Sequence, residues 1–335
     1  MNKRRQNRTY AWMVWLLAGI CLFLGGCTGG PEERASAAGG YEATDSRGNT
    51  LLFQQPPSRI VSYSISTDEI LAEMIPAERI AAVTYLADDP GISNITNAVK
   101  KIPGRIQRNT SAEGVLALQP DLVVVPDFIA PEVIKSMQDI GLPVYVYRTP
   151  HTMEEIKAVI RDLALVTGDV KQAEPLIRHM DKQLEKARRH TETFRVKEKR
   201  RAVFLRENGV YFSSNSSFRE LCRYAGIEDI TADMGNRKAG WLSVEEVVHR
   251  KPDIFVVADW NYDGHHDTGE HIQAILTNPA YQDTPAWKNK NIIVIRGALL
   301  LSVSQYMADA ALELAEKVYP DRSAEHEDSV GSFGT

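Results

Sequence analysis

Residues 111–127 read SAEGVLALQPDLVVVPD and residues 243–259 read SVEEVVHRKPDIFVVAD, with 8 of the 17 positions identical at an offset of 132 residues. Each copy begins with a serine, Ser111 or Ser243, that is placed to cap a short helix. Glu246, three residues after Ser243, completes the pattern of a capping box. A Pro-Asp pair ends each helix, and a run of apolar residues follows. This repeat predicts one helix–strand unit in each half of the chain.

The segments around both copies alternate between strand and helix patterns. In the first half we expect strands at 60–63, 80–83, 122–125 and 144–147, and helices at 68–74, 111–118 and 131–140. In the second half we expect strands at 202–206, 230–232, 254–257 and 292–295, and helices at 217–224, 244–249, 270–277 and 304–318. The repeat strands are apolar on both faces, as central strands of a parallel sheet are. The predicted fold class is therefore α/β, with two Rossmann-like lobes that each contain a parallel sheet.

The segment between the two halves shows no strand pattern. Apolar residues recur at helical spacing from Ile156 to Val166, which predicts one long connecting helix over residues 151–196. Gly168 and Pro175 are positions at which this helix would bend or divide into two pieces. The lobes are then expected at 51–150 and 197–320, followed by a polar tail at 321–335.

The N-terminus resembles the signal peptide of a bacterial lipoprotein over residues 1–26. Four cations within residues 3–8 precede an apolar run at 11–24, which is too short for an ordinary membrane span. The run ends at Leu24-Gly25-Gly26-Cys27, and in lipoproteins the corresponding thiol carries the lipid. A plain membrane anchor with an incidental cysteine is the alternative. Residues 27–50 are rich in Gly, Ala, Ser and Glu and predict a flexible tether.

Net charge and cysteine content exclude several classes of protein. The 335 residues carry a net charge of −5, so nothing in the charge balance predicts binding to nucleic acid. The three cysteines form no Cys-x-x-Cys pair and no zinc-site spacing. Cys21 would be removed with the signal peptide, and Cys222 falls in a predicted helix, where we expect a buried thiol.

In this order and spacing, the segments resemble the substrate-binding proteins of ABC importers for iron chelates, haem and cobalamin, over residues 58–320. The similarity is carried by the two repeat copies and by RIVSYSISTDEIL (59–71), IAAVTYLADDP (80–90), GLPVYVY (141–147) and NPAYQDTPAWKNKNIIVI (278–295). The resemblance implies a ligand held between two lobes that one long helix joins, with no intrinsic cofactor and no enzymatic activity. It also implies an extracytoplasmic, membrane-anchored lipoprotein whose partner is a permease dimer with its ATPase.

The resemblance assigns a role to one glutamate in each lobe. In that family, a glutamate near the start of the repeat helix docks onto arginines of the permease. The matching positions are Glu113 and Glu245, which lie 132 residues apart in the two repeat copies. The helix dipole favours a carboxylate at these positions whether or not a partner binds.

Ligands of open parallel sheets bind outside the carboxyl ends of the strands, and this rule selects a set of loops. Aromatic residues there are suited to stacking on a flat or macrocyclic ligand, and arginines to pairing with carboxylates or chelated anions. For any single aromatic residue, packing in the core or at the rim is the alternative. The candidate cleft residues are Tyr63, Tyr85, Phe128, Tyr147, Arg148, Arg206, Tyr211, Trp241, Trp260, Tyr262 and Arg296.

Two polar stretches bear on which chelate is bound. Residues 106–109 and the pair Asp88-Asp89 stand where haem and cobalamin binders of the family often have aromatic residues. We therefore expect an iron–siderophore first, then cobalamin or haem. His265, His266 and His271 form a candidate metal site, although their spacing matches no closed tetrahedral motif and a solvated loop is the alternative.

The alternative function is an extracytoplasmic enzyme, or a zinc-binding lipoprotein, on the same two-lobed fold. Against an enzyme, the chain contains no GxSxG, HExxH, Walker A or GxGxxG motif. The acidic pair Glu245-Glu246 is accounted for by helix capping. A scaffold or adhesin would not explain a cleft bordered by aromatic residues and arginines.

Overall fold

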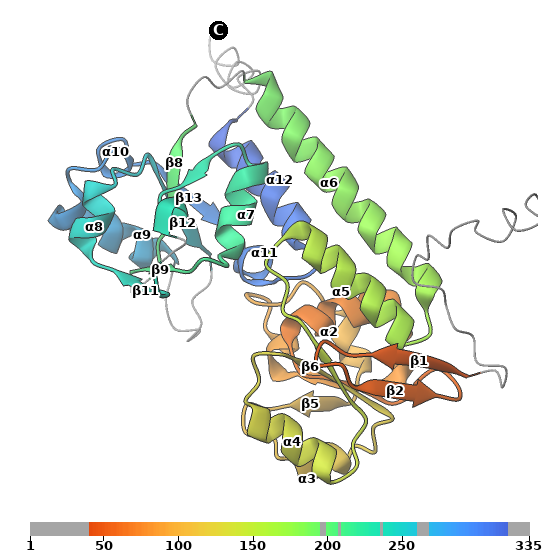
Figure 1. Ribbon diagram of the computed structural model, residues 1–335. Helices are drawn as coiled ribbons and strands as arrows, with labels where there is room; N and C mark the ends of the chain where they lie inside the picture. Colours follow the sequence, from red (N-terminus) through yellow and green to blue (C-terminus); the bar gives the residue numbers. More distant parts are fainter. Residues whose placement is uncertain (1–39, 195–198, 207–208, 235–236, 260–267, 321–335) are drawn as a thin grey trace, which may run out of the picture. The chain divides into compact units, whose positions relative to one another are not determined.

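The computed structural model describes residues 40–194, 199–206, 209–234, 237–259 and 268–320. The predicted signal peptide, Cys27, most of the predicted tether and the polar tail lie outside the described residues. Within them, no helix combines the length and the apolar character needed to cross a membrane. The predicted α/β class with two parallel sheets is confirmed (Figure 1).

The N-terminal lobe contains a five-stranded sheet in the order β5-β4-β3-β6-β7, in which every neighbouring pair is parallel. The strands are β3 (Ile60–Ser62), β4 (Ile80–Thr84), β5 (Gly104–Ile106), β6 (Leu122–Pro126) and β7 (Val144–Tyr147). The helices are α2 (Ile65–Met74), α3 (Ala112–Leu116) and α4 (Pro131–Asp139), with the 3-10 turns η1 (Ala77–Arg79), η2 (Tyr85–Asp88) and η3 (Ala98–Lys101). The chain changes direction across the sheet between β3 and β6, which is where ligands of such sheets bind.

The C-terminal lobe contains a four-stranded parallel sheet in the order β10-β8-β12-β13. Its strands are β8 (Arg201–Phe204), β10 (Glu228–Asp229), β12 (Ile254–Ala258) and β13 (Ile292–Ile295), while β9 (Val210–Phe212) and β11 (Gly240–Leu242) form a separate antiparallel pair. The helices are α7 (Ser217–Tyr224), α8 (Val244–His249), α9 (Thr268–Thr277), α10 (Pro285–Lys288), α11 (Gly297–Leu301) and α12 (Met307–Val318), with the turns η5 (Ala232–Met234) and η6 (Pro279–Tyr281).

The prediction of a strand at residues 230–232 is wrong. The strand at this place, β10, ends at Asp229, and a 3-10 turn begins at Ala232. The buried carboxylate of Asp229 accepts hydrogen bonds from the backbone amide of Thr231 at 2.9 Å and from its hydroxyl at 2.8 Å. These two bonds turn the chain out of the sheet directly after Asp229.

The two repeat copies adopt the same local structure. The hydroxyls of Ser111 and Ser243 each accept a hydrogen bond at 3.2 Å from the amide three residues on, and Glu246 closes the predicted capping box. Gln119 and Lys251, again 132 residues apart, both have a positive φ, 51° and 47°, at the turn that follows the helix. The sequence repeat is therefore a repeat of helix cap and turn.

The aspartate of each Pro-Asp pair binds the start of the neighbouring strand. Asp121 accepts hydrogen bonds from the amides of Ser58 at 2.7 Å and Arg59 at 2.8 Å, just before β3. Asp253 accepts one from the amide of Arg201 at 2.8 Å, at the start of β8. In both lobes this contact sets the repeat strand beside the first strand of the sheet.

The predicted connecting helix over residues 151–196 divides into two helices. The first helix, α5 (Met153–Val166), and the second, α6 (Ala173–Thr193), are separated by a reversal at Gly168, whose φ is 76°, and by the 3-10 turn η4 (Val170–Gln172). Arg79 holds the reversal by donating to Asp169 at 2.7 Å and to the carbonyl of Thr167 at 2.6 Å. The chain does not divide at Pro175, because that residue lies in the first turn of α6, where its missing N–H costs no helical bond. The longer helix, α6, packs on α5, α7 and α12 (Figure 1).

The predicted tether boundary at residue 50 falls inside a β-hairpin. The hairpin consists of β1 (Tyr41–Thr44) and β2 (Thr50–Phe53). Its turn is held by Asp45, which accepts hydrogen bonds from the amides of Arg47 and Asn49 at 2.9 and 2.8 Å. The amide of Ser46 donates to the carbonyl of Val146 at 2.8 Å, so the turn covers the outer edge of β7. Composition alone missed this hairpin because such short strands depend on packing against another element.

Each lobe has its own apolar core, and polar contacts connect the two. Val61, Val123 and Ile134 are fully buried in the N-terminal core, and Phe255 and Val257 in the C-terminal core. Between the lobes, Asn94 donates to the carbonyl of Ala298 at 2.9 Å. The amide of Met153, at the start of α5 in the connecting segment, donates to Glu220 of the C-terminal lobe at 3.0 Å.

Candidate functional site

A cavity of about 250 Å³ lies at the carboxyl end of β8, and we call it the β8 cavity. It is lined by Val203, Phe204, Arg206, Val210, Tyr211, Ser213, Asn215, Ser216, Ser217, Phe218, Asp229, Thr231, Leu300 and Leu301. Most of these residues come from the end of β8, from β9 and from the serine-rich segment that leads into α7. The cavity is therefore where the rule for parallel sheets places a ligand.

A second cavity, of about 470 Å³, lies between residues of the two lobes, and we call it the inter-lobe cavity. It is lined by Asp127, Arg148, Thr149, His151, Thr152, Glu155, Ser214, Asn215, Ser216, Arg219 and Glu220. Asn215 and Ser216 line both cavities, so the start of α7 separates them. A third cavity, of about 330 Å³, is bordered by the hairpin turn, β7 and α5.

Three of the predicted cleft residues line the first two cavities. Arg148, after β7, lines the inter-lobe cavity, and Arg206 and Tyr211 line the β8 cavity. The guanidinium carbon of Arg206 lies 4.9 Å from the ring centroid of Phe204. The surrounding protein removes part of the hydration of Arg206 and lowers its pKa. The rings of Tyr211 and Trp241 pack edge-on with their centroids 5.4 Å apart, and both side chains are about half exposed.

The other predicted aromatic residues of the N-terminal lobe lie outside these two cavities. Tyr63 packs on the N-terminal core, and its buried hydroxyl has no hydrogen-bond partner among the described residues. Tyr147 is 3% exposed, its hydroxyl shares a hydrogen bond of 2.7 Å with the hydroxyl of Ser64, and it borders the third cavity. Tyr85 begins the turn η2, and Phe128 is 67% exposed after β6.

The remaining predicted residues are either engaged elsewhere or not described. Arg296 forms an ion pair with Glu313 of α12 at 3.0 Å, and this carboxylate offsets the charge of Arg296. His271 lies on α9, and in the part of the chain that the structure describes no three His, Cys, Asp or Glu side chains group to hold a metal ion. Trp260, Tyr262, His265 and His266 lie outside the described residues.

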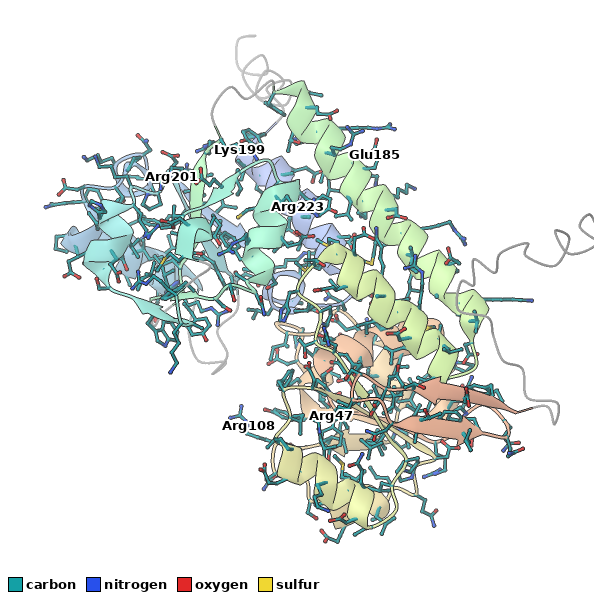
Figure 2. The ribbon with its side chains drawn as sticks, in the orientation of Figure 1. Arg47, Arg108, Glu185, Lys199, Arg201 and Arg223 are labelled. Carbon is teal, nitrogen blue, oxygen red and sulfur yellow. The ribbon has the colours of Figure 1, made fainter. Side chains whose placement is uncertain are left out.

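The carboxylates that line the two cavities already accept hydrogen bonds from nearby groups. Asp127 accepts from the amide and hydroxyl of Thr149 at 3.1 and 2.7 Å. Glu155 accepts from the amide of His151 at 2.7 Å as part of the cap of α5. Glu220 accepts from Arg223 of α7 at 2.8 Å, and Figure 2 labels this arginine. These acids are therefore engaged by the protein itself.

The cations of the same cavities are less completely paired. Within the described residues, neither Arg148 nor Arg206 has a carboxylate partner. Arg219 donates to the carbonyls of Thr231 and Ser214. Its buried Nε has no hydrogen-bond acceptor among the described residues but forms a long ion pair with Asp229 at 3.8 Å. Paired acids beside unpaired guanidinium groups favour the binding of an anion.

Several cavity residues were not predicted individually. Ser213, Asn215, Ser216 and Thr149 lie in loops that the strand-end rule had selected, but the choice of aromatic residues passed over them. Arg219 and His151 lie just beyond those loops. The signal available in the sequence was the run Ser213-Ser214-Asn215-Ser216-Ser217, which stands between a strand end and a helix.

Glu113 and Glu245 occupy equivalent and accessible positions. Each is the second residue of its helix, α3 or α8, and each is exposed. A hydrogen bond from its own backbone amide and one with the capping serine lower the pKa of each carboxyl. Neither forms an ion pair with another described residue, whereas the adjacent Glu246 pairs with Arg237 at 3.2 Å. Both are therefore charged and available at neutral pH.

Comparisons with known proteins agree on one family. The family model described as periplasmic binding protein matches residues 60–299. A Bacillus subtilis (strain 168) protein named uncharacterized ABC transporter substrate-binding lipoprotein YvrC is 23% identical over 331 residues, which cover 94% of this chain and 98% of that protein. The apo structure of the periplasmic heme-binding protein RhuT from Roseiflexus sp. RS-1 superposes with a TM-score of 0.66 at 25% identity, covering 78% of this chain and 98% of that one. A periplasmic binding protein from Veillonella parvula superposes with a TM-score of 0.70 at 18% identity, covering 85% and 99%.

Proposed function

Because this chain belongs to the periplasmic binding protein family, we propose that it is the substrate-binding component of an ABC importer and captures a metal chelate where the β8 cavity and the inter-lobe cavity meet. The observation that carries the proposal is the pair Arg148 and Arg206. They come from different lobes, line adjoining cavities at strand ends, and have no carboxylate partner among the described residues. A pair of free guanidinium groups across two lobes is suited to holding one charged ligand.

An iron–siderophore is the preferred ligand, followed by cobalamin or haem. The inter-lobe cavity is lined by polar and charged side chains, and the lining of the β8 cavity is about half polar. The serine, asparagine and arginine side chains of both cavities support this order, because they suit an oxygen-rich chelate more than a bare macrocycle. The similarity to RhuT, whose name describes heme binding, supports keeping haem among the candidates. The protein binds its ligand and does not transform it.

Delivery follows from docking of the two lobes on a permease dimer that works with an ATPase. Glu113 and Glu245 supply one free carboxylate on each lobe, and two separated charges set the orientation on a basic partner. A lipid on Cys27 would hold the protein at the outer side of the membrane. We expect little closure of the lobes, since α6 packs on helices of both and polar contacts join them.

Ligand screening by thermal shift tests the binding part of the proposal. The panel is ferric siderophores, haem, cobalamin and Zn²⁺ alone, each incubated with the protein and then checked for chemical change. One chelate is expected to raise the melting temperature and to be recovered unchanged. A response to Zn²⁺ alone, or turnover of a chelate, would favour the zinc-binding or enzymatic alternative.

Charge reversal tests the docking part. The double variant Glu113→Lys and Glu245→Lys is expected to lose chelate uptake in cells while purified protein keeps its affinity for the chelate. Glu132→Lys is the matched control, because Glu132 is also an exposed second residue of a helix, α4, but lies outside the repeat. Reduced chelate affinity in the double variant, or equal loss of uptake in the control, contradicts docking through these two carboxylates.

A further inference from the structure

We infer that the third cavity is a second binding site, and that it takes a small organic cation: an ammonium group on a short apolar chain. The cavity has a volume of about 330 Å³ and is formed by the hairpin turn, by β7 and by α5. Asp45, Tyr145 and Asp162 line this cavity and neither the β8 cavity nor the inter-lobe cavity. A ligand held by these three side chains therefore occupies a place apart from the proposed chelate site.

The first observation is a buried hydroxyl that borders the cavity without a partner. Val144 and Val146 of β7 belong to the N-terminal core, so Tyr145 points to the opposite face of the sheet, where α5 lies. Tyr145 is only 4% exposed, and among the described residues nothing forms a hydrogen bond with its hydroxyl. Tyr147 faces the same way, but its hydroxyl is engaged by Ser64. The Tyr145 hydroxyl is therefore a polar group that a ligand in the cavity can satisfy.

The second observation is an excess of negative charge that includes one free carboxylate. The charged side chains that line the cavity are those of Arg148, Asp45, Glu155 and Asp162. Asp45 holds the hairpin turn and Glu155 the cap of α5, each by accepting hydrogen bonds from backbone amides. Within the described part of the chain, Asp162 has no hydrogen-bond or ion-pair partner, and Arg148 pairs with none of the three acids. One carboxylate is thus available to a cation from outside the protein.

The electrostatics of the cavity favour a positively charged donor. Burial, and then the nearby carboxylates of Asp162 and Asp45, raise the pKa of Tyr145, so its hydroxyl stays neutral at neutral pH. The surrounding protein removes part of the hydration of Asp162 and raises its pKa, and the adjacent Arg161 counters this only in part. A neutral hydroxyl and a poorly hydrated, unpaired carboxylate can both accept hydrogen bonds from one ammonium group.

The third observation is an apolar wall beside these acceptors. Glu155, Ala158, Val159 and Asp162 line the cavity from α5, and their spacing places them on one face of that helix. Ala158 lies in the middle of this face and is exposed, so its small side chain leaves room for a ligand. Pro150 adds to the apolar lining from the segment after β7. The cavity therefore suits an ammonium group whose remaining atoms form a short hydrocarbon chain.

Three variants remove the three features separately. Asp162→Asn removes the free carboxylate with little change in size, at an exposed position of α5 that should tolerate it. Tyr145→Phe removes only the unpartnered hydroxyl. Ala158→Leu fills the cavity from the exposed face of α5 and retains a good helix former.

Each variant has a matched control. Asp139→Asn removes an exposed aspartate from α4, where it pairs with Lys135. Tyr147→Phe removes a hydroxyl that borders the same cavity but is already bonded to Ser64. Ser136→Leu adds a leucine to an exposed position of α4.

The probe is n-pentylammonium, and 1-pentanol is its neutral analogue of equal chain length. In ¹⁵N-labelled protein, n-pentylammonium is expected to shift the amide resonances of Ser46 and Ala158, which line the cavity. Its affinity should fall about tenfold or more in Asp162→Asn and Ala158→Leu, and about three- to tenfold in Tyr145→Phe. The three controls should bind it as the parent does.

The same titrations contain the results that would overturn the inference. Equal binding of 1-pentanol would mean that the positive charge is not recognised. Unchanged affinity in Asp162→Asn and Ala158→Leu, or no shift at Ser46 and Ala158, would mean that the cavity does not bind the probe. Tighter binding of Ca²⁺ alone at these resonances would replace the organic cation by a metal ion. Every measurement is made without a chelate, so the outcome is independent of the proposed function.

Discussion

Glu69 and Ser304 are 235 residues apart in the chain, and the hydroxyl of Ser304 donates a hydrogen bond to the buried carboxylate of Glu69. Glu69 lies on α2 of the N-terminal lobe, and Ser304 lies between α11 and α12 of the C-terminal lobe. Ser302 donates to the same oxygen, while the amide and side chain of Asn94 donate to the other, both at 2.8 Å. This fully buried carboxylate has four donors, and the two from Ser302 and Ser304 join the lobes.

Removing both serine hydroxyls tests the strength of this connection. The double variant Ser302→Ala and Ser304→Ala leaves Glu69 buried with half of its donors, so we expect the free energy of unfolding to fall by about 2–5 kcal/mol. Urea denaturation measures the change. Ser136→Ala, which removes an exposed hydroxyl from α4, should cost less than about 0.5 kcal/mol. Equal effects of the two changes would show that Glu69 does not depend on these donors.

Asp68 should make stability depend on pH. Burial raises its pKa from 3.8 to about 7, although Thr84 donates two hydrogen bonds to one of its oxygens. Between these values the folded protein holds a proton that the unfolded chain has lost, so stability should fall as the pH rises from 4 to 7. The slope contributed by one such group is at most roughly 1.4 kcal/mol per pH unit.

Asp68→Asn imitates the protonated carboxyl and should reduce that slope. Some dependence will remain, because burial also raises the pKa of the neighbouring Glu69. Urea denaturation at pH 5, 6, 7 and 8 measures it, with Asp139→Asn on the exposed face of α4 as the control. An unchanged slope in Asp68→Asn would mean that Asp68 is ionised in the folded protein throughout this range.

Replacing glycine by alanine should have different effects on stability at two positions. A β-carbon at Gly104 in β5 would lie 2.5 Å from the carbonyl oxygen of Ala81, so Gly104→Ala should cost about 1–3 kcal/mol. At Gly114 in α3 the nearest atom is the Thr110 methyl at 3.2 Å, and alanine is the better helix former. Gly114→Ala should therefore be neutral or stabilising by up to about 1 kcal/mol. Melting temperatures of both variants give the comparison, and a similar loss in each would contradict it.

The equivalent aspartates of the two repeat copies, Asp121 and Asp253, should contribute different amounts to the free energy of unfolding. Asp121 accepts three hydrogen bonds, from the amide and hydroxyl of Ser58 and from the amide of Arg59. Asp253 accepts one through its side chain, from Arg201. Asp121→Ala should therefore destabilise the protein more than Asp253→Ala, by about 1–2 kcal/mol. Chemical denaturation of both variants measures the difference, and the reverse order would mean that the number of bonds does not set the cost.

Local features of the fold were predictable wherever neighbouring residues decide them. The caps at Ser111 and Ser243, and the apolar strands that follow each Pro-Asp pair, depend on residues within one repeat copy. The sequence also indicated two positions, Gly168 and Pro175, at which the helix over residues 151–196 could divide, and it divides at Gly168. The hairpin β1–β2 was not, because it is held by the distant strand β7.

The sequence by itself determined the fold class, the two-fold repeat and the equivalent carboxylates Glu113 and Glu245, because helix caps and strand patterns are set by residues close together in the chain. Only the tertiary structure decided which predicted arginines are free for a ligand. Arg296 is paired with Glu313 from another element, whereas Arg148 and Arg206 have no described acidic partner. The partner of a charged side chain depends on elements far apart in sequence, and only packing brings them together.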